Sequence, residues 1–180
     1  MINKKTFKLS IIIPCYNEKN TIKKVIERIN QSLEYYKILR FEILIVDDQS
    51  NDGTKEILNN LANQEKIQIY FHDKNLGKGA AIHTALKYAN GDITIIQDAD
   101  LEYDPSHYEI FIEEIKKKKE ILALYGSRVL GKDSFQNAQN FSHKIRIWGN
   151  IFLTFVSNKI NNQNLTDAHT CYKMFQSKIF

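Results

Sequence analysis

The stretch ITIIQDADLEYDP, residues 93–105, begins as an apolar run and ends in a cluster of carboxylates. Its first four residues are apolar or β-branched, which is typical of a buried strand in the middle of a sheet. Carboxylates then stand at every second position, namely Asp98, Asp100, Glu102 and Asp104. Side chains of like charge repel one another at this spacing unless a cation compensates them. We therefore expect a positive group at the end of this strand.

The chain around this stretch alternates short apolar runs with longer segments of helical spacing. The runs lie at residues 9–13, 41–46, 66–71, 92–97 and 121–126. The segments between them carry apolar stripes, such as Ile22, Val25 and Ile29. This alternation predicts an α/β protein whose mainly parallel sheet is covered on both faces. The predicted fold class is therefore a three-layer α/β/α, Rossmann-like fold.

A polar cluster follows each predicted strand. In chain order the clusters are PCYNE, DDQSNDGT, HDKNLGKG, DADLE and GSR. In open parallel sheets, ligands bind beyond the carboxyl ends of the strands, near the point where the strand order reverses. Five clusters at equivalent positions predict a ligand site at this edge of the sheet.

The acidic pair Asp98 and Asp100 is the candidate metal site. Hard carboxylate oxygens with no His or Cys nearby suit Mg²⁺ or Mn²⁺ and leave positions open for water and phosphate. Glu102 is a candidate third ligand. The alternative is an acidic surface turn that caps the helix starting at Pro105. The preceding buried strand favours the metal, and Asp104, directly before Pro105, is expected to be the cap.

Two further clusters carry candidate nucleotide contacts. Asp48 can accept a hydrogen bond from a nucleobase N–H, whereas Asp47 is expected to accept backbone N–H groups of its turn. Asp52 is expected to serve the same turn as a cap. Lys78 stands between two glycines in NLGKG, which lacks the full phosphate-loop pattern, so a nucleotide contact and a plain turn are both open. Arg128 can hold a phosphate in bidentate fashion, with a plain surface arginine as its alternative.

Composition narrows the class of partner. The chain has 180 residues and a net charge of +4, and its longest basic run, residues 116–119, ends a predicted helix. The helix dipole favours cations there. The sequence has no basic stripe with interleaved aromatic residues, the pattern typical of a nucleic-acid-binding protein. Cys15 and Cys171 fit no metal spacing and are expected to be reduced thiols of a cytoplasmic protein. No apolar run approaches the ~20 residues of a membrane span, so no transmembrane segment is expected.

Five motifs together resemble family 2 glycosyltransferases. They are IIIPCYNE, ILIVDDQSNDGT, NLGKGAAIHTAL, IIQDADLEYDP and YGSR, and they are spread over residues 9–128. The resemblance implies the A-type nucleotide-diphospho-sugar transferase fold. The patterns P-x-Y-N-E, D-A-D-L and G-S-R, with LTDAHTCYKMF at residues 165–175, are most similar to the dolichyl-phosphate mannose synthase-like branch.

The resemblance also implies roles for individual residues. The expected nucleotide and donor contacts are Pro14, Tyr16, Glu18, Val46, Asp48, Lys78, Asp98 and Ala99. Asp100 and the position of Glu102 would bind the metal, which in turn binds the diphosphate. That position is commonly Gln in the synthases, so the charge differs here. Arg128 would serve the donor sugar or the acceptor phosphate.

The implied reaction is a metal-dependent, inverting transfer of a hexose from a nucleotide-sugar, of the GDP-mannose or UDP-glucose type, to a polyprenyl or dolichyl phosphate. Asp167 would orient the acceptor or act as a base, with a turn cap as its alternative. A polysaccharide or other sugar acceptor is a second possibility. Because relatives continue beyond Phe180, residues 1–180 are expected to be one truncated catalytic domain, and an inactive nucleotide-binding module is a third possibility.

The segment at residues 143–160 combines an apolar face with flanking basic residues. Trp148, Phe152 and Phe155 lie on that face, and His143 and Lys159 lie beside it. An amphipathic helix resting on a membrane and a helix packed on the sheet are equally open. The membrane alternative would place the protein at the inner face of the cytoplasmic membrane.

Overall fold

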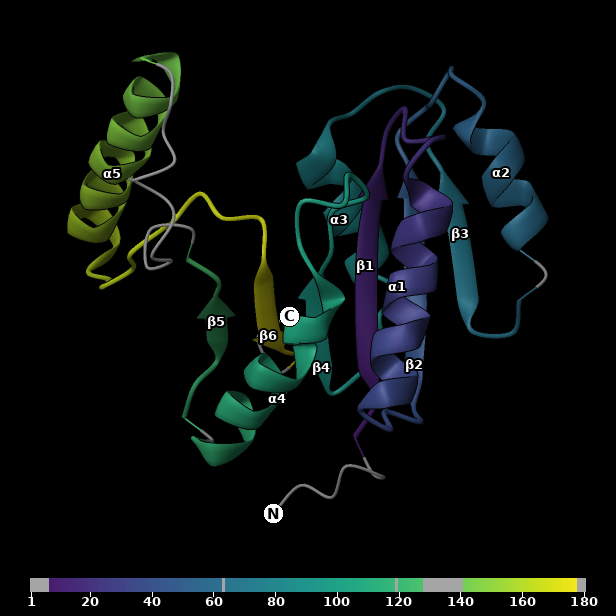
Figure 1. The fold of residues 1–180 in the computed structure, drawn as a ribbon, viewed down its shortest axis with the longest axis horizontal. Helices are drawn as coiled ribbons and strands as arrows, with labels where there is room; N and C mark the ends of the chain where they lie inside the picture. Colours follow the sequence, from purple (N-terminus) through teal and green to yellow (C-terminus); the bar gives the residue numbers. More distant parts are fainter. Residues whose placement is uncertain (1–6, 63, 119, 128–140, 178–180) are drawn as a thin grey trace. The chain divides into compact units, whose positions relative to one another are not determined.

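A mostly parallel sheet forms the centre of the fold (Figure 1). The computed structural model describes residues 7–62, 64–118, 120–127 and 141–177. Within these residues, six strands follow the order β3-β2-β1-β4-β6-β5. They are β1 (Leu9–Cys15), β2 (Phe41–Asp47), β3 (Ile67–Phe71), β4 (Ile93–Ile96), β5 (Ala123–Tyr125) and β6 (Lys173–Gln176).

The first four strands are parallel and in fixed register. Leu9 of β1 pairs with Phe41 of β2 on one side and with Ile93 of β4 on the other. Chain order reverses at β1, because β2 and β3 extend the sheet one way and β4 the other. This reversal point is where a parallel sheet offers a ligand site at its carboxyl edge.

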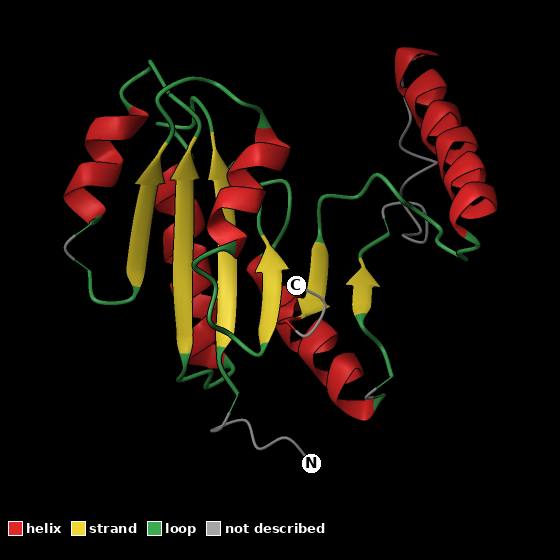
Figure 2. Cartoon of the chain, turned by 180° about the vertical axis from the view of Figure 1, so that it is seen from behind, coloured by secondary structure: helices red, strands yellow, loops and turns green. Residues whose placement is uncertain are grey.

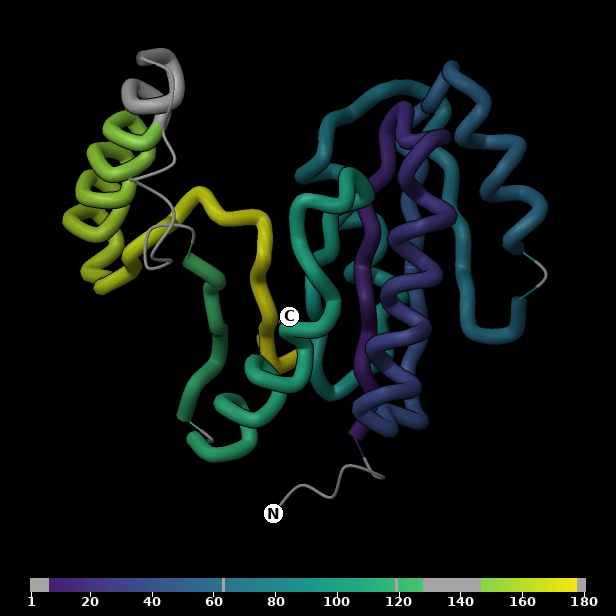
Figure 3. Tube along the Cα trace, viewed as in Figure 1, coloured from purple at the N-terminus to yellow at the C-terminus, as the bar shows by residue number. Residues whose placement is uncertain are grey.

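Helices cover both faces of this sheet (Figure 2). The crossovers between successive strands run through helices, as the chain trace in Figure 3 shows. They are α1 (Ile22–Tyr35), α2 (Thr54–Leu61), α3 (Lys78–Leu86) and α4 (Tyr108–Lys117), with a 3₁₀ turn η1 (Pro105–His107) before α4. α1 lies on one face and α3 on the other. The predicted three-layer α/β/α fold is confirmed.

Burial follows the apolar pattern of the sequence. Every residue of β1 is buried, as expected for a strand covered on both faces. The predicted stripe of α1 is buried throughout, including Ile22, Val25 and Ile29. On the opposite face, Ala81 and Ala85 of α3 pack on Ile12, Leu44 and Val46. These small side chains let α3 approach the sheet closely and so fix the height of its N-terminus beside the strand ends.

Contacts divide the chain into two compact units. One comprises residues 1–124 and 174–180, and the other Tyr125–Lys173. The prediction of a single domain over residues 1–180 therefore stays a prediction. In the part of the chain that the structure describes, no helix is both long enough and apolar enough to span a bilayer.

The second unit consists mainly of α5 (Phe141–Asn161) and the loop after it. Asn158 binds Leu165 twice, donating to its carbonyl at 2.8 Å and accepting from its N–H at 3.0 Å. Thr154 Oγ1 accepts a bond from the Ala168 N–H at 3.1 Å. These bonds fold the loop back onto α5 and hold the buried Asp167 in place.

Candidate active site

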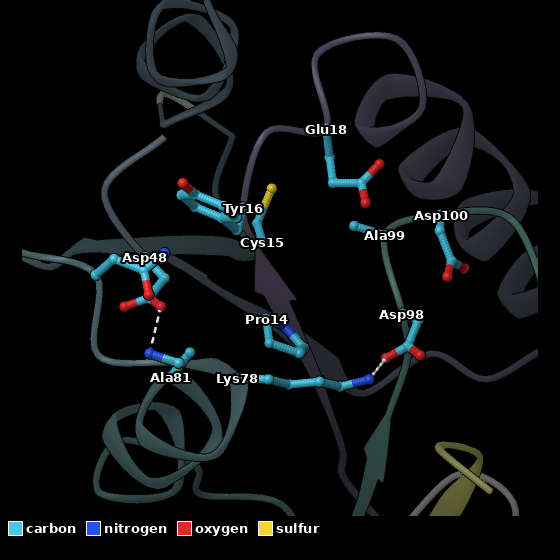
Figure 4. Close-up of a pocket in the computed structure, with 12 residues that line it drawn as sticks. Pro14, Cys15, Tyr16, Glu18, Asp48, Lys78, Ala81, Asp98, Ala99 and Asp100 are labelled. Carbon is cyan, nitrogen blue, oxygen red and sulfur yellow. Dashed lines mark hydrogen bonds and ion pairs between the residues drawn. The ribbon is translucent and has the colours of Figure 1, made fainter. Parts of the chain in front are cut away.

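A pocket of about 390 Å³ lies in the first unit, within the size range of small-molecule sites (Figure 4). It opens at the carboxyl ends of β1, β2 and β4, the edge that the sequence predicts. Its lining comprises Pro14, Cys15, Tyr16, Glu18, Asp48, Asn75, Gly77, Lys78, Ala81, Asp98, Ala99 and Asp100. The structure thus brings together eight of the predicted site residues, from four separate sequence motifs.

Hydrogen bonds between two loops shape the pocket wall after β1. Asn17 adopts a left-handed backbone conformation, with φ of 57°, and its side chain accepts a bond from the Asn51 N–H at 2.9 Å. Asp52 accepts from the Thr54 N–H at 3.0 Å and the Lys19 N–H at 3.2 Å, which confirms its role in this turn, although the N-cap position of α2 is Gly53. With the loop fixed, Tyr16 stays 47% exposed at the pocket and presents a flat aromatic face.

Asp48 connects the end of β2 to the glycine-containing loop that follows β3, residues 72–79. Its Oδ1 accepts bonds from His72 Nδ1 at 2.7 Å and from the Leu76 N–H at 2.9 Å, and its Oδ2 accepts from the Gly77 N–H at 2.6 Å. Burial alone would raise the pKa of the Asp48 carboxyl, but these bonds hold the pKa below its usual value. Asp48 is therefore a charged acceptor at neutral pH.

His72 contributes to the site by binding Asp48, a role that sequence reasoning missed. An ionised carboxylate only accepts hydrogen bonds, so His72 must carry its proton on Nδ1. Its Nε2 lies 2.9 Å from Thr84 Oγ1 in α3. His72 therefore links Asp48 to α3. The available signal was its position as the first residue after the third predicted strand.

Lys78 supplies the positive group that the acidic strand end requires. It is the first residue of α3, directly after Gly77, whose φ of 88° turns the chain into the helix. Its Nζ lies 2.5 Å from Asp98 Oδ1, and Figure 4 shows the side chain reaching across the pocket. Tyr16 and Asp48 lie on one side of the pocket, and Asp98 and Asp100 on the other.

Gln97 braces the turn that presents the two carboxylates. Its side chain is fully buried. Its amide nitrogen donates to the carbonyls of Asp98 at 3.2 Å and Tyr103 at 3.0 Å, and its oxygen accepts from the Tyr108 hydroxyl at 2.9 Å. Sequence reasoning missed this role, although a polar residue ending an apolar strand was its signal. The brace fixes the backbone on which Asp98 and Asp100 stand.

The carboxylates at the pocket could supply only part of the coordination shell of a hard divalent cation. Among the described residues, no group of three or more His, Cys, Asp or Glu side chains could hold a metal ion. Glu102 is exposed and lies outside the pocket lining, so its metal role stays a prediction. Asp98 and Asp100 do line the pocket, and Mg²⁺ typically needs only one or two carboxylates beside phosphate oxygens. The pair fits a cation that is shared with a diphosphate.

Three other predicted residues lie elsewhere or are not described. Val46 packs in the core beneath α3 and is not among the lining residues. Asp167 belongs to the second unit. Arg128 lies outside the described residues. Their functional roles stay predictions.

Two predictions about neighbouring carboxylates are confirmed. Asp104 accepts a bond from the Ser106 N–H at 2.9 Å and so caps the turn before α4. Asp47 accepts from the Ser50 N–H at 3.1 Å, within its own turn. Neither residue lines the pocket, which leaves Asp98 and Asp100 as its acidic pair on this wall.

Comparison with known proteins identifies the class. The family model described as Glycosyl transferase family 2 matches residues 10–180, and the chain belongs to this family. It is 33% identical over 130 residues to a dolichol-phosphate mannosyltransferase of Pyrococcus furiosus, covering 72% of this chain and 36% of that protein. It is 31% identical over 176 residues to the dolichyl-phosphate beta-glucosyltransferase ALG5D of Trichomonas vaginalis, covering 93% and 53%. These relatives confirm the predicted branch, and the chain spans about half of their length or less.

Solved structures confirm the A-type fold. Glucosyl-3-phosphoglycerate synthase from Mycobacterium tuberculosis, solved with Mn²⁺, UDP and phosphoglyceric acid, superposes with a TM-score of 0.68. The two share 17% identity, and the match covers 97% of this chain and 57% of that one. A mannosyltransferase from Pyrobaculum calidifontis, in complex with GDP-Man and Mn²⁺, gives a TM-score of 0.57 at 24% identity, covering 68% and 36%.

Proposed function

We propose that this chain is the donor-binding catalytic part of an inverting glycosyltransferase that moves a hexose from a nucleotide-sugar to a polyprenyl or dolichyl phosphate. The observation that carries the proposal is the pocket, which gathers Tyr16, Asp48, Lys78, Asp98 and Asp100 at the carboxyl edge of the sheet. The names of the two relatives, a mannosyltransferase and a glucosyltransferase of dolichyl phosphate, support the acceptor class.

The two sides of the pocket divide the donor between them. The nucleoside lies against Tyr16 and Asp48, and the diphosphate extends toward Asp98 and Asp100. Asp98 and Asp100 would hold Mg²⁺ or Mn²⁺, which would supply positive charge to stabilise the departing nucleoside diphosphate. Lys78 exchanges its contact with Asp98 for a phosphate oxygen. The chain thereby moves a positive charge toward the leaving group as the donor binds.

The acceptor side needs little proton chemistry. A phosphate monoester has a second pKa of about 6 and is largely ionised near neutral pH. It attacks the anomeric carbon from the face opposite the leaving group, which inverts the configuration. Positioning and charge stabilisation therefore carry the reaction, without a strong base. Asp167 and Arg128 are proposed to orient the acceptor phosphate and the donor sugar.

A peripheral membrane contact through residues 143–160 accompanies a lipid acceptor. Trp148, Phe152 and Phe155 of α5 are 68%, 64% and 58% exposed, an unusual cost for large apolar side chains in water. Insertion of this face into the headgroup region would remove it from water and keep the enzyme at the inner face of the membrane.

The test is release of nucleoside diphosphate from GDP-mannose and UDP-glucose, measured with and without Mn²⁺ and with and without a short polyprenyl phosphate. We expect release that requires the metal and rises with the lipid phosphate. Metal-dependent hydrolysis without stimulation by the lipid phosphate would favour a different sugar acceptor. If the chain neither binds nor hydrolyses any of these donors, the proposal is contradicted.

A further inference from the structure

We propose that the donor pocket selects uridine over guanosine nucleotides, and that His72 is the residue that sets this selectivity. The proposal rests on the function proposed above, in which Asp48 meets the nucleobase. It adds the identity of the base. The Asp48 carboxylate already accepts three hydrogen bonds from its own chain, which limits what a nucleobase can donate to it.

The Asp48 carboxylate is nearly saturated. A carboxylate offers about four acceptor positions, two on each oxygen. Within the described part of the chain, Oδ1 accepts from His72 and Leu76, and Oδ2 accepts from Gly77. One position remains, on Oδ2. The side chain is only 4% exposed, so water adds little acceptor or donor capacity around it.

The two candidate bases differ in what they offer this carboxylate. Guanine presents two adjacent donors, N1–H and the 2-amino group, which pair with a carboxylate through both of its oxygens. With Oδ1 fully used, only one of the two donors would find an acceptor on Asp48. Uracil presents a single donor, N3–H, which needs one acceptor position. A buried unpaired donor costs enough free energy to lower affinity by about tenfold or more.

The His72 ring cannot move away from Asp48 without losing other contacts. Its other nitrogen, Nε2, is engaged by Thr84 Oγ1 of α3, and its side chain is 9% exposed. Moving the ring away from Asp48 would break both bonds. The Leu76 N–H is equally fixed, since it belongs to the loop that leads into α3. His72 is therefore a specificity-determining residue that acts through Asp48.

The test compares UDP and GDP binding to the full chain by isothermal titration calorimetry in the presence of Mn²⁺. We expect UDP to bind at least about tenfold more tightly than GDP. Equal affinities, or tighter GDP binding, would overturn this inference and leave the proposed function standing. If neither nucleotide binds, the proposed function itself is contradicted.

Variants then test the part played by His72. His72→Leu removes the donor to Oδ1 and should bring the UDP-to-GDP affinity ratio close to one. His72→Asn keeps a donor near the position of Nδ1 and should restore the preference. Thr84→Val is the matched control, because it removes the outer bond and keeps the inner one. An unchanged ratio in folded His72→Leu would exclude His72 as the determinant, and the ratio for the unaltered chain tests the base preference if that variant does not fold.

Discussion

The ammonium nitrogen of Lys78 lies 2.5 Å from Oδ1 of Asp98, so the acidic end of β4 is compensated by a cation from the chain itself. Asp98 is buried and cannot rely on water to screen its charge. Lys78 starts a helix and has a long, partly exposed side chain that can swing. In the function proposed above, a divalent cation would compete with Lys78 for Asp98, and the diphosphate of the donor would compete with Asp98 for Lys78.

Lys78→Met should weaken nucleoside diphosphate binding in the presence of Mn²⁺ by about tenfold, because a charge-assisted bond to phosphate is lost. The same change should strengthen binding of Mn²⁺ alone, since Asp98 loses its competing partner. Calorimetric titration of each ligand separates the two effects. Lys74→Met, in the same loop and outside the pocket lining, is the matched control. Weaker binding of Mn²⁺ alone would contradict the competition.

Gln97→Leu should uncouple the acidic turn from the strand that carries it. The change removes bonds to Asp98, Tyr103 and Tyr108. We expect a loss of about 2–3 kcal/mol in the free energy of unfolding and a larger proportional loss of metal-dependent donor affinity. Tyr108→Phe removes only one of these bonds and should cost about 1 kcal/mol while sparing donor affinity. Equal effects of the two variants on donor affinity would argue against a bracing role.

Glu42→Gln should destabilise the protein in a pH-dependent manner. Burial would raise the pKa of Glu42, but bonds from Lys8, Ser10 and the Asn90 N–H lower it below its usual value. A lowered pKa contributes stability above the ordinary value of about 4.3, and this is lost as the pH falls through the folded-state value. The variant should cost about 2 kcal/mol at pH 7.

Urea unfolding at about pH 7 and about pH 3 measures this dependence. The difference between Glu42→Gln and the unaltered chain should shrink at the lower pH, because the Glu42 carboxyl of the unfolded chain takes up a proton there and the stability that comes from the lowered pKa declines. Glu120→Gln, at an exposed position, should change little at either pH. A constant difference across the range would mean that packing, and not charge, accounts for the loss.

Much of this site could be predicted from sequence, because strand-end clusters are local features. The apolar runs gave the strands, and parallel order brings their carboxyl ends to one edge. The contribution of His72 depends on register instead. Asp47 of β2 pairs with Phe71 of β3, and the His72 N–H donates to the Asp47 carbonyl at 2.9 Å. Sequence alone does not provide that register, so the neighbourhood of His72 and Asp48 could not be foreseen.

Gln97 and Lys78 illustrate the same limit. Two partners of Gln97, the carbonyls of Asp98 and Tyr103, belong to a turn in which Leu101 has a φ of 69°. The sequence does not indicate this left-handed conformation. The acidic stretch correctly predicted a positive group. Whether a side chain or a metal supplies it depends on where α3 begins, and the structure places Lys78 at that first position.

Membrane contact through α5 should be visible by co-sedimentation with anionic vesicles at moderate salt. Trp148, Phe152 and Phe155 recur at helical spacing, so replacing Phe152 and Phe155 by Ser should reduce the bound fraction severalfold. Tyr35→Ser on α1, an even more exposed aromatic position, is the control. Absence of binding by the unaltered chain, or an equal loss in the Tyr35 variant, would remove the membrane role.

The central claim is that a divalent cation joins the Asp98–Asp100 wall to the diphosphate of the donor. Asp100→Asn tests it most directly, because the amide keeps an oxygen for the Glu102 N–H, now bound at 2.9 Å, and removes only the charge. Glu102→Gln, outside the pocket lining, should have a smaller effect. We predict that Mn²⁺ tightens UDP or GDP binding to the unaltered chain by at least about tenfold and does not tighten binding to Asp100→Asn. An undiminished Mn²⁺ response in Asp100→Asn would contradict the claim.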